Sequence, residues 1–254
     1  MFNLFYSVFI FLFGLIVGSF LNCIVYRLER RKSFLRGRSF CPKCNHDLNW
    51  MDLIPILSYV LLAGKCRYCK EKISLHYPVV ELITGALFLS VFLMGGGIFE
   101  IIFNSIIVSL LIIIFIFDFK HYIIPDRIVY LAILISLVWL LYIKVDILTT
   151  IYALLVSFGF LLLIVLVSKG KWMGMGDVKL ALFMGLFLGW PNVLVALFSA
   201  FLLGSIVGVF LILNRRKSLS SEIPFGPFLV IGTLVALFKA EDLINWYLAL
   251  FLIQ

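Results

Sequence analysis

The sequence has few charged residues: Asp, Glu, Lys and Arg make up 13% of its 254 residues, whereas hydrophobic residues make up 64%. Soluble globular chains are ordinarily about half apolar and about a quarter charged. The shortage of charge excludes a soluble globular protein, because so much apolar surface cannot be buried in a fold surrounded by water. We therefore expect an all-α integral membrane protein.

Positive charge is missing ahead of the first apolar run, which extends from Met1 to Tyr26. A signal peptide carries its positive charge before the apolar segment, so a cleavable signal peptide is not expected. Four basic residues follow the run instead: Arg27, Arg30, Arg31 and Lys32. This order predicts a spanning helix that ends in the cytoplasm. The sequence also lacks internal repeats and low-complexity segments.

Long apolar runs are abundant, and segments near 20 residues can cross a bilayer. We expect about eight transmembrane helices, at residues 4–26, 78–98, 99–118, 128–143, 147–168, 177–190, 192–213 and 226–238. Gly95-Gly96-Gly97 is interpreted as a turn, and the tail from Leu243 to Gln254 either lies in the interface or lengthens the last helix. The predicted parts are a first transmembrane helix at 1–26, a cytoplasmic insert at 27–77 and a transmembrane core at 78–254.

The net charge of +8 supports the expected orientation. When the eight segments are threaded alternately, every basic residue except Lys144 and Lys239 falls on one side, as is typical of the cytoplasmic side. We therefore expect a multi-pass protein of the cytoplasmic (inner) membrane. Because the basic residues are dispersed over short loops, they predict contact with anionic lipid and no binding of nucleic acid.

Four of the five cysteines form two C-x2-C pairs separated by 21 residues: Cys41, Cys44, Cys66 and Cys69. Two such turns can present four thiolates to Zn²⁺ in a tetrahedron. Two disulfides are the alternative, but a cytoplasmic insert faces a reducing compartment. We expect a structural zinc site, because four cysteines leave no open coordination position. Cys23 is interpreted as a packing residue, and His46 and His76 as surface or interface residues.

Two carboxylates mark a candidate active site. Asp118 ends the apolar run LLIIIFIFDFK, and Asp177 begins an apolar helix within Gly174-Met175-Gly176-Asp177. The threading places both at the cytoplasmic side, and an ionisable residue in a membrane segment indicates function. Paired carboxyl groups that share a proton can activate water for peptide hydrolysis. The alternative for Asp177 is a helix-capping role, whereas Asp118 lies where the helix dipole disfavours a negative charge.

Several stretches, in order along the chain, resemble the bacterial type IV prepilin peptidase family. Besides the two C-x2-C pairs, these are residues 18–27, 55–59, 77–82, 118–126, 174–180 and 224–228. The resemblance implies an aspartyl endopeptidase of the GxGD class, which removes the basic leader of prepilins and pseudopilins after a glycine. It implies Asp118 and Asp177 as the catalytic pair, and Gly174 and Gly176 as residues that shape the loop around Asp177. Asp126, interpreted as a helix N-cap, is not assigned to catalysis.

The cysteine-bearing insert is typical of longer family members that also methylate the new N-terminus with S-adenosylmethionine. The resemblance therefore implies a bifunctional enzyme, and the sequence leaves open whether it serves a type IV pilus, type II secretion or DNA uptake. No glycine-rich nucleotide-binding motif indicates the site of the methyl donor. Glu81, Asn22 and Asp52 are polar residues near the insert that are either structural or part of such a site.

Other functions are compatible with some of these features. A cation- or proton-coupled transporter also places carboxylates in apolar helices, although usually near the middle of the membrane. A structural subunit of a secretion machine would use the zinc insert only for docking. The substrate leader and the cytoplasmic face are both basic, so we expect affinity to come from packing of the substrate helix against the spans. The oligomeric state is left open.

Overall fold

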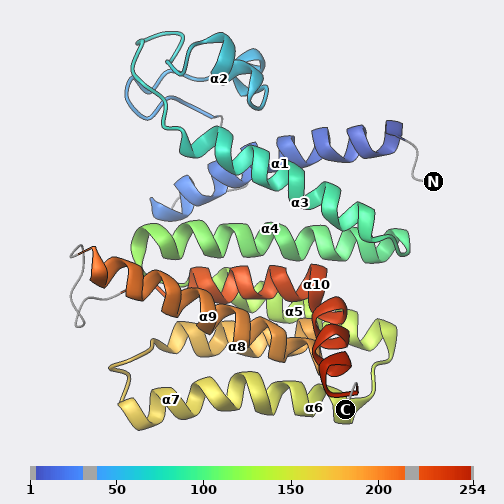
Figure 1. The fold of residues 1–254 in the computed structure, drawn as a ribbon. Helices are drawn as coiled ribbons and strands as arrows, with labels where there is room; N and C mark the ends of the chain where they lie inside the picture. The colour runs from blue at the N-terminus through green and yellow to red at the C-terminus, as the bar shows by residue number, and fades with distance from the viewer. Residues whose placement is uncertain (1–3, 31–38, 215–222, 253–254) are drawn as a thin grey trace. The chain divides into compact units, whose positions relative to one another are not determined.

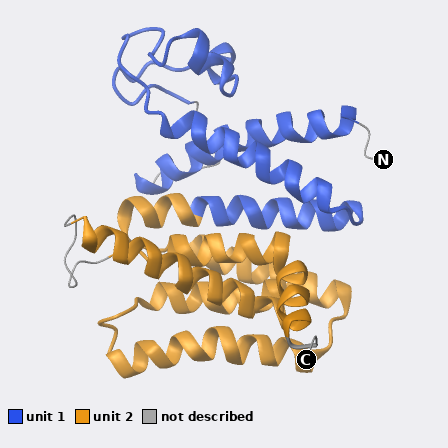
Figure 2. Cartoon of the chain, in the orientation of Figure 1, with its two compact units in different colours: residues 1–113 blue, residues 114–254 orange. Residues whose placement is uncertain are grey.

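The computed structural model describes residues 4–30, 39–214 and 223–252, and within these ranges the protein is helical (Figure 1). Two isolated β-bridges in the insert are the only extended pairing there. The chain divides into two compact units, residues 1–113 and 114–254 (Figure 2). The predicted all-helical membrane fold is confirmed.

Unit 1 is built on two long helices, α1 (Leu4–Glu29) and α3 (His76–Met94), which pack along each other. Glycines permit the close approach. A Cβ atom added to Gly14 would lie 2.8 Å from the Cα atom of Gly85, and one added to Gly18 would lie 2.7 Å from the Cα atom of Glu81. The two helix backbones therefore touch beside Glu81, where any larger residue in place of Gly18 would push them apart.

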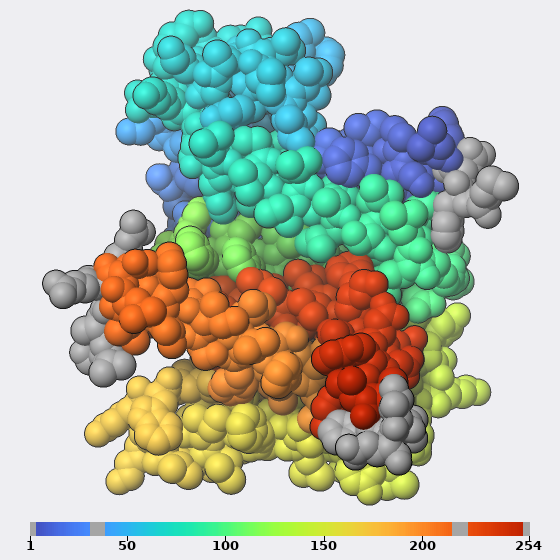
Figure 3. Space-filling view, viewed as in Figure 1, coloured from blue at the N-terminus to red at the C-terminus, as the bar shows by residue number. Residues whose placement is uncertain are grey.

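The insert between α1 and α3 contains two short helices, η1 (Trp50–Leu53) and α2 (Leu57–Leu61). The rest of its described part, from residue 39 on, is turns, two isolated bridges and irregular segments, and it forms a lobe of its own beyond the N-terminal end of α3 (Figure 3). Many of its larger apolar side chains are exposed, including Trp50, Leu57 and Leu61. So small an apolar core cannot hold the lobe together alone, which favours a stabilising metal.

A glycine turn joins α3 to α4 (Ile98–His121), as predicted, with Gly95 and Gly96 at φ values of 83° and 104°. Helix α4 runs from unit 1 into unit 2. Unit 2 continues with α5 (Asp126–Ile143), α6 (Ile147–Leu154), the π-helical turn η2 (Leu155–Gly159) and α7 (Phe160–Ser168). It ends with α8 (Met175–Leu188), α9 (Asn192–Leu213) and α10 (Gly226–Leu252).

Helix α8 lies at the centre of unit 2, in contact with α5, α6, η2, α7, α9 and α10 (Figure 1). Val178, Leu180, Ala181, Phe183 and Met184 are at most 1% exposed. A helix that is apolar on all sides is buried either in lipid or in protein, and here the surrounding helices bury it. The first turn of α8 is therefore rigidly positioned by its own core packing.

The predicted count of about eight spans is not confirmed. Six helices in the described part of the chain are long and apolar enough to cross a membrane: α1, α3, α4, α5, the continuous α6–α7 segment and α9. Helix α8 has only 14 residues, about 21 Å at 1.5 Å per residue, against a hydrocarbon core of about 30 Å. Helix α10 continues through Lys239, Glu241 and Asp242 to Leu252, so the predicted tail lengthens the last helix.

Candidate functional site

Two aspartates from distant parts of the sequence line one cavity in unit 2. Asp118 lies in the last turn of α4 and Asp177 in the first turn of α8. The residues are 4% and 9% exposed, and the cavity has a volume of about 460 Å³. The carboxylate of Asp118 acts electrostatically on that of Asp177. The structure thus brings together the two acids that the sequence suggests as a pair.

The two carboxylates have few hydrogen-bond partners. Oδ2 of Asp177 accepts the backbone N–H of Gly174 at 3.3 Å. The backbone of Gly226 approaches the carboxylate of Asp118, whose Oδ2 is buried and makes no hydrogen bond of ordinary geometry among the described residues. Buried polar atoms are nearly always satisfied, so this oxygen suits a shared proton.

Ile124, which is 7% exposed, packs between two glycines at the site. A Cβ atom on Gly176 would lie 3.1 Å from Cβ of Ile124, and one on Gly226 would lie 3.1 Å from Cδ1 of the same side chain. A Cβ on Gly226 would also collide with the carboxylate of Asp118. A Cβ atom on Gly174, by contrast, would make only an ordinary contact of 3.7 Å, so the backbone is closely approached at Gly176 and not at Gly174.

Gly226 and Ile124 were not identified as site residues from the sequence. Gly226 belongs to Pro224-Phe-Gly-Pro-Phe228, a glycine between an aromatic residue and a proline at a helix start. That pattern indicates a tight backbone approach, but it does not indicate which side chain is approached. Ile124 follows the end of α4 and has no local signal of a special role.

Asp126 also borders the cavity, but it is engaged elsewhere. It is the first residue of α5, whose N-cap is Pro125, so the N-cap interpretation is wrong by one position. Its Oδ1 lies 2.7 Å from Nζ of Lys179, and this lysine also lies over the ring of Tyr130. The pair ties α5 to α8 and leaves Asp118 and Asp177 as the acids buried in the cavity.

The mouth of the cavity carries large apolar side chains. Tyr122, Ile123 and Trp172 line it and are 52%, 61% and 77% exposed. Met173 and Phe225 complete this apolar rim. Such a surface suits the side chains of an apolar peptide segment, whereas the acids lie deeper.

The four predicted cysteine ligands come together in unit 1. Their sulfur atoms lie within 4.8 Å of one another, and Sγ of Cys41 and Sγ of Cys69 are 3.9 Å apart. A tetrahedral zinc site with Zn–S bonds of about 2.3 Å places its sulfurs roughly 3.8 Å apart. All four thiols are free, which contradicts the disulfide alternative. The cluster can hold a metal ion.

The two cysteine turns have the same backbone geometry. In the first, the N–H of Cys41 bonds the carbonyl of His46 and the N–H of Asn45 bonds the carbonyl of Cys41. In the second, the corresponding bonds join Cys66 to Glu71 and Lys70 to Cys66. Asn45 and Lys70 both have positive φ, 56° and 59°. The insert therefore contains a short structural repeat that the sequence analysis did not identify.

Backbone hydrogen bonds also prepare a thiolate at Cys41. Burial raises the pKa of this thiol, but hydrogen bonds from the N–H groups of Cys44 and Lys43 outweigh burial and lower the pKa to about 7. Neither predicted surface histidine is part of the cluster. The ring of His46 packs on Tyr68 instead, 3.7 Å between centroids.

Asp52 fastens η1 to the second cysteine turn. Its Oδ1 lies 2.7 Å from Nε of Arg67, and its Oδ2 accepts the backbone N–H of Asn49 and the hydroxyl of Tyr68. Burial raises the pKa of Asp52, but these contacts, led by Arg67, leave it lower than usual. All of these bonds stay within the insert, and Asp52 also lines the second cavity described next.

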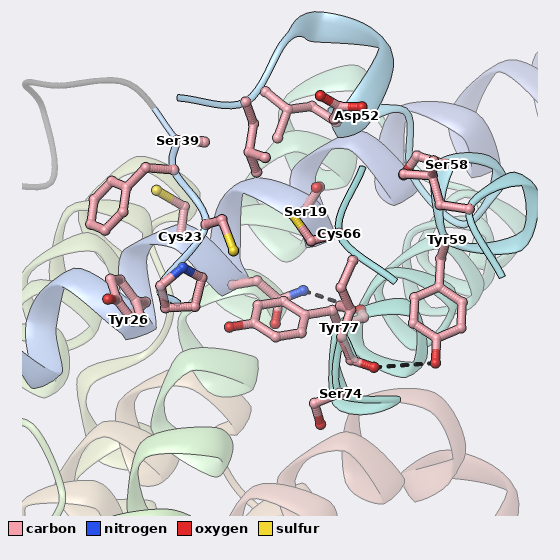
Figure 4. Close-up of a pocket in the computed structure, with 18 of the residues that line it drawn as sticks. Ser19, Cys23, Tyr26, Ser39, Asp52, Ser58, Tyr59, Cys66, Ser74 and Tyr77 are labelled. Atoms are coloured by element: carbon pink, nitrogen blue, oxygen red, sulfur yellow. Dashed lines mark hydrogen bonds between the residues drawn. The ribbon is translucent and has the colours of Figure 1, made fainter. Parts of the chain in front are cut away.

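Asn22 and Glu81 are brought to the wall of a second cavity, enclosed by α1, α3 and the insert (Figure 4). Nδ2 of Asn22 donates to the carbonyl of Tyr77 at 3.1 Å. Oε2 of Glu81 accepts the backbone N–H of Ile56 at 2.8 Å. Cys23, predicted to be a packing residue, lines this cavity as well.

Comparisons with known proteins give two family matches. The bacterial peptidase A24 N-terminal domain matches residues 12–94, and the type IV leader peptidase family matches residues 105–209. No solved structure matches the chain. The first match contains the cysteine cluster and the second contains both buried aspartates.

Similar proteins carry one name, prepilin leader peptidase/N-methyltransferase. The Legionella pneumophila protein is 31% identical, over 93% of this chain and 92% of its own length. The Bacillus subtilis protein is 33% identical, over 94% and 96%, and the Aeromonas hydrophila protein is 31% identical, over 96% and 94%. Identity at this level over nearly the whole length establishes common descent: the chain belongs to the prepilin leader peptidase family.

Proposed function

We propose that this protein is a membrane aspartyl endopeptidase that removes the leader peptide of type IV prepilins or pseudopilins after a glycine. The observation that carries the proposal is the pair of buried carboxylates, Asp118 and Asp177, in one cavity of unit 2. The name of the relatives supplies the substrate class.

The chemistry follows from two carboxyl groups that share a proton. One, as carboxylate, takes a proton from water, and the resulting hydroxide oxygen attacks the carbonyl carbon of the scissile bond. The other, protonated, donates its proton to the carbonyl oxygen. Collapse of the tetrahedral intermediate then breaks the C–N bond, and the leaving nitrogen takes up a proton from the pair. No covalent bond to the enzyme forms.

The position of the pair favours a protease over a transporter. Both aspartates lie in terminal turns of their helices, rather than at the middle of a span. An exposed apolar rim beside the acids accommodates a peptide that carries an apolar segment, and the acids next to it complement the basic leader. Oδ2 of Asp118 is buried against the backbone of Gly226, which suits the carboxyl group that holds the shared proton.

The cysteine cluster is proposed to hold one structural Zn²⁺. The donor set fits, because four sulfurs at tetrahedral spacing satisfy the ion completely. Asp118 and Asp177 lie outside the insert, so cleavage does not need this metal. We place the insert and the aspartate pair on the cytoplasmic side of the inner membrane, since basic residues crowd the insert.

We further propose that the protein methylates the N-terminus that cleavage exposes. S-adenosylmethionine, when bound, supplies an electrophilic methyl group. The acceptor would be the N-terminal amine of the mature peptide, once it has lost its proton. The name of the relatives supports this activity.

Incubation of the purified protein with a synthetic prepilin and S-adenosylmethionine tests both activities. Mass spectrometry should show loss of the leader and a gain of one methyl group on the mature N-terminus. An intact prepilin after prolonged incubation would refute the peptidase proposal, and cleavage without methyl gain would refute the methyl transfer. Ion flux in vesicles without cleavage would favour the transporter.

A further inference from the structure

Unit 1 has a cavity that the peptidase site does not use. It has a volume of about 370 Å³ and is lined by α1, α3 and both cysteine turns. Ligand pockets in proteins usually measure about 300 to 1,000 Å³. In Figure 4, Ser19, Cys23 and Tyr26 lie along α1 on one side, and Tyr59 and Tyr77 lie on the other. The cavity is therefore large enough for a cofactor-sized molecule.

A buried carboxylate without a cation lies in its wall. Glu81 is 8% exposed, and its recorded hydrogen-bond partners are both neutral: the N–H of Ile56 at 2.8 Å and the side chain of Ser19. Four basic residues line the same cavity: Arg67 and Lys43 are bound to Asp52 and Glu71, whereas Arg27 and Lys72 are not among the partners that the structure gives Glu81. A buried carboxylate is costly unless a positive charge compensates it.

The backbone beside Glu81 is strained. Ile56, whose N–H Glu81 accepts, has φ 60° and ψ −50°, a conformation that β-branched residues rarely adopt. Strain of this kind persists only where the surroundings enforce it, and it concentrates at functional sites. The close contact of α1 and α3 at Gly18 fixes the backbone of Glu81.

A second polar group in the wall has no partner. The hydroxyl of Tyr26 is buried and makes no hydrogen bond within the described ranges. Its ring meets Phe40 edge to face, with centroids 5.8 Å apart, and the guanidinium of Arg30 already lies over the ring, 4.8 Å from its centroid. Tyr59 and Tyr77 add further aromatic surface. Aromatic faces bind cations and stack on planar rings, so the wall combines a carboxylate, a free hydroxyl and aromatic faces.

We infer that this cavity is the methyl-transfer site and that Glu81 binds the positive charge of a reactant there, either a sulfonium or an ammonium group. The identity of the reactants rests on the proposed methyl transfer. Both reactants carry such a charge: the donor has a sulfonium and the mature peptide has an N-terminal ammonium. Tyr26 supplies a hydroxyl for the polar groups of the same ligand.

Binding to the full-length, zinc-loaded protein in nanodiscs tests the inference by isothermal titration calorimetry. The probes for the donor are S-adenosylmethionine, S-adenosylhomocysteine, which lacks the sulfonium, and sinefungin, which carries an ammonium in its place. The probes for the acceptor are a short peptide with the mature pilin N-terminus and its N-acetylated form, added with S-adenosylhomocysteine present.

Glu81→Gln keeps the acceptor for Ile56 N–H and removes the charge. If Glu81 faces the donor, wild type should bind S-adenosylmethionine and sinefungin at least tenfold more tightly than S-adenosylhomocysteine, and Glu81→Gln should abolish the difference. If Glu81 faces the acceptor, Glu81→Gln should bind the free-amine peptide at least tenfold more weakly than wild type does. Its affinity for that peptide should then equal its affinity for the acetylated peptide. Tyr26→Phe should lower the affinity for the probe that binds through Glu81 by a few-fold.

Two checks keep folding separate from binding. Glu81→Asp, which keeps the charge, should restore part of the affinity, and Glu100→Gln, an exposed acid of the same unit, should bind as wild type does. Zinc content and leader cleavage should be unchanged in Glu81→Gln. Equal binding of all probes by wild type and Glu81→Gln, or no binding by wild type, would overturn the inference. Wild type that binds a cationic probe through Glu81 but never methylates would support the site and refute the proposed methyl transfer.

Discussion

The backbone of Gly226 lies directly against the carboxylate of Asp118, so that a side chain there would collide with the acid. Gly226 begins α10, and Ile124 packs beside it. The start of one helix thus fixes the position of an acid at the end of another. This relationship gives a test of the site that leaves both aspartates in place.

Gly226→Ala should lower kcat/KM for leader cleavage by at least about tenfold, or about 1.4 kcal/mol in transition-state stabilisation, because the new methyl group displaces Asp118. The control is Gly208→Ala on α9, where a Cβ atom would meet nothing within 4 Å. Cleavage assays on both variants in the same membranes measure kcat/KM and test this prediction. Unchanged kcat/KM in Gly226→Ala would show that the contact does not position the acid.

Asp126→Asn should leave cleavage within about threefold of wild type. Its ion pair with Lys179 is partly exposed, with side-chain exposures of 56% and 29%, and pairs of that kind contribute less than about 1 kcal/mol. The same cleavage assay measures this. A loss as large as that of an Asp118 or Asp177 variant would mean that Asp126 takes part in the chemistry.

Much of this site was predictable from residue type and order. The two acids were identifiable because charge is rare in apolar runs, and the orientation of basic residues placed them on one side of the membrane. Their actual meeting was not predictable, since it depends on how α4 and α8 pack. The role of Gly226 depends on the same packing, so no local pattern around it could name Asp118 as its neighbour.

The predicted number of spans is not confirmed, and helix α8 gives one physical reason. Residues 177–190 are as apolar as a membrane span, but α8 is apolar because other helices enclose it. Composition alone does not distinguish burial in lipid from burial in protein. The short length of this segment, 14 residues in α8, was the one feature that indicated burial in protein. The cysteine cluster was predictable because four ligands at fixed short spacing need little tertiary information.

Cys41→Ser should remove bound zinc, because the three remaining sulfurs bind the ion much more weakly. Metal analysis of the purified variant should fall from about one zinc per chain towards zero. Methylation should fall with it, while leader cleavage continues, since the aspartate pair belongs to residues 114–254. Cys23→Ser is the matched control and should retain its zinc, because Cys23 is not part of the cluster. Loss of zinc in both variants would contradict the assigned ligand set.

Asp52→Asn should loosen the insert without removing a zinc ligand. The pKa of Asp52 is lowered by its contacts in the folded protein, so its stabilising effect is present above its ordinary pKa of about 3.9 and is lost as the pH falls through the lowered value. At pH 7 the variant should therefore release zinc to a chelator a few-fold faster than wild type. Identical release rates at pH 7 would show that the Asp52–Arg67 pair does not stabilise the insert.

The most direct test of the account is leader cleavage by Asp118→Asn, Asp177→Asn and the double variant, each shown to be folded by retained zinc and an unchanged circular dichroism spectrum. Because the two acids act as one unit, each single variant should lose on the order of 10³-fold or more in kcat, and the double variant should be little worse. Full cleavage by either folded single variant would contradict the paired-carboxylate mechanism.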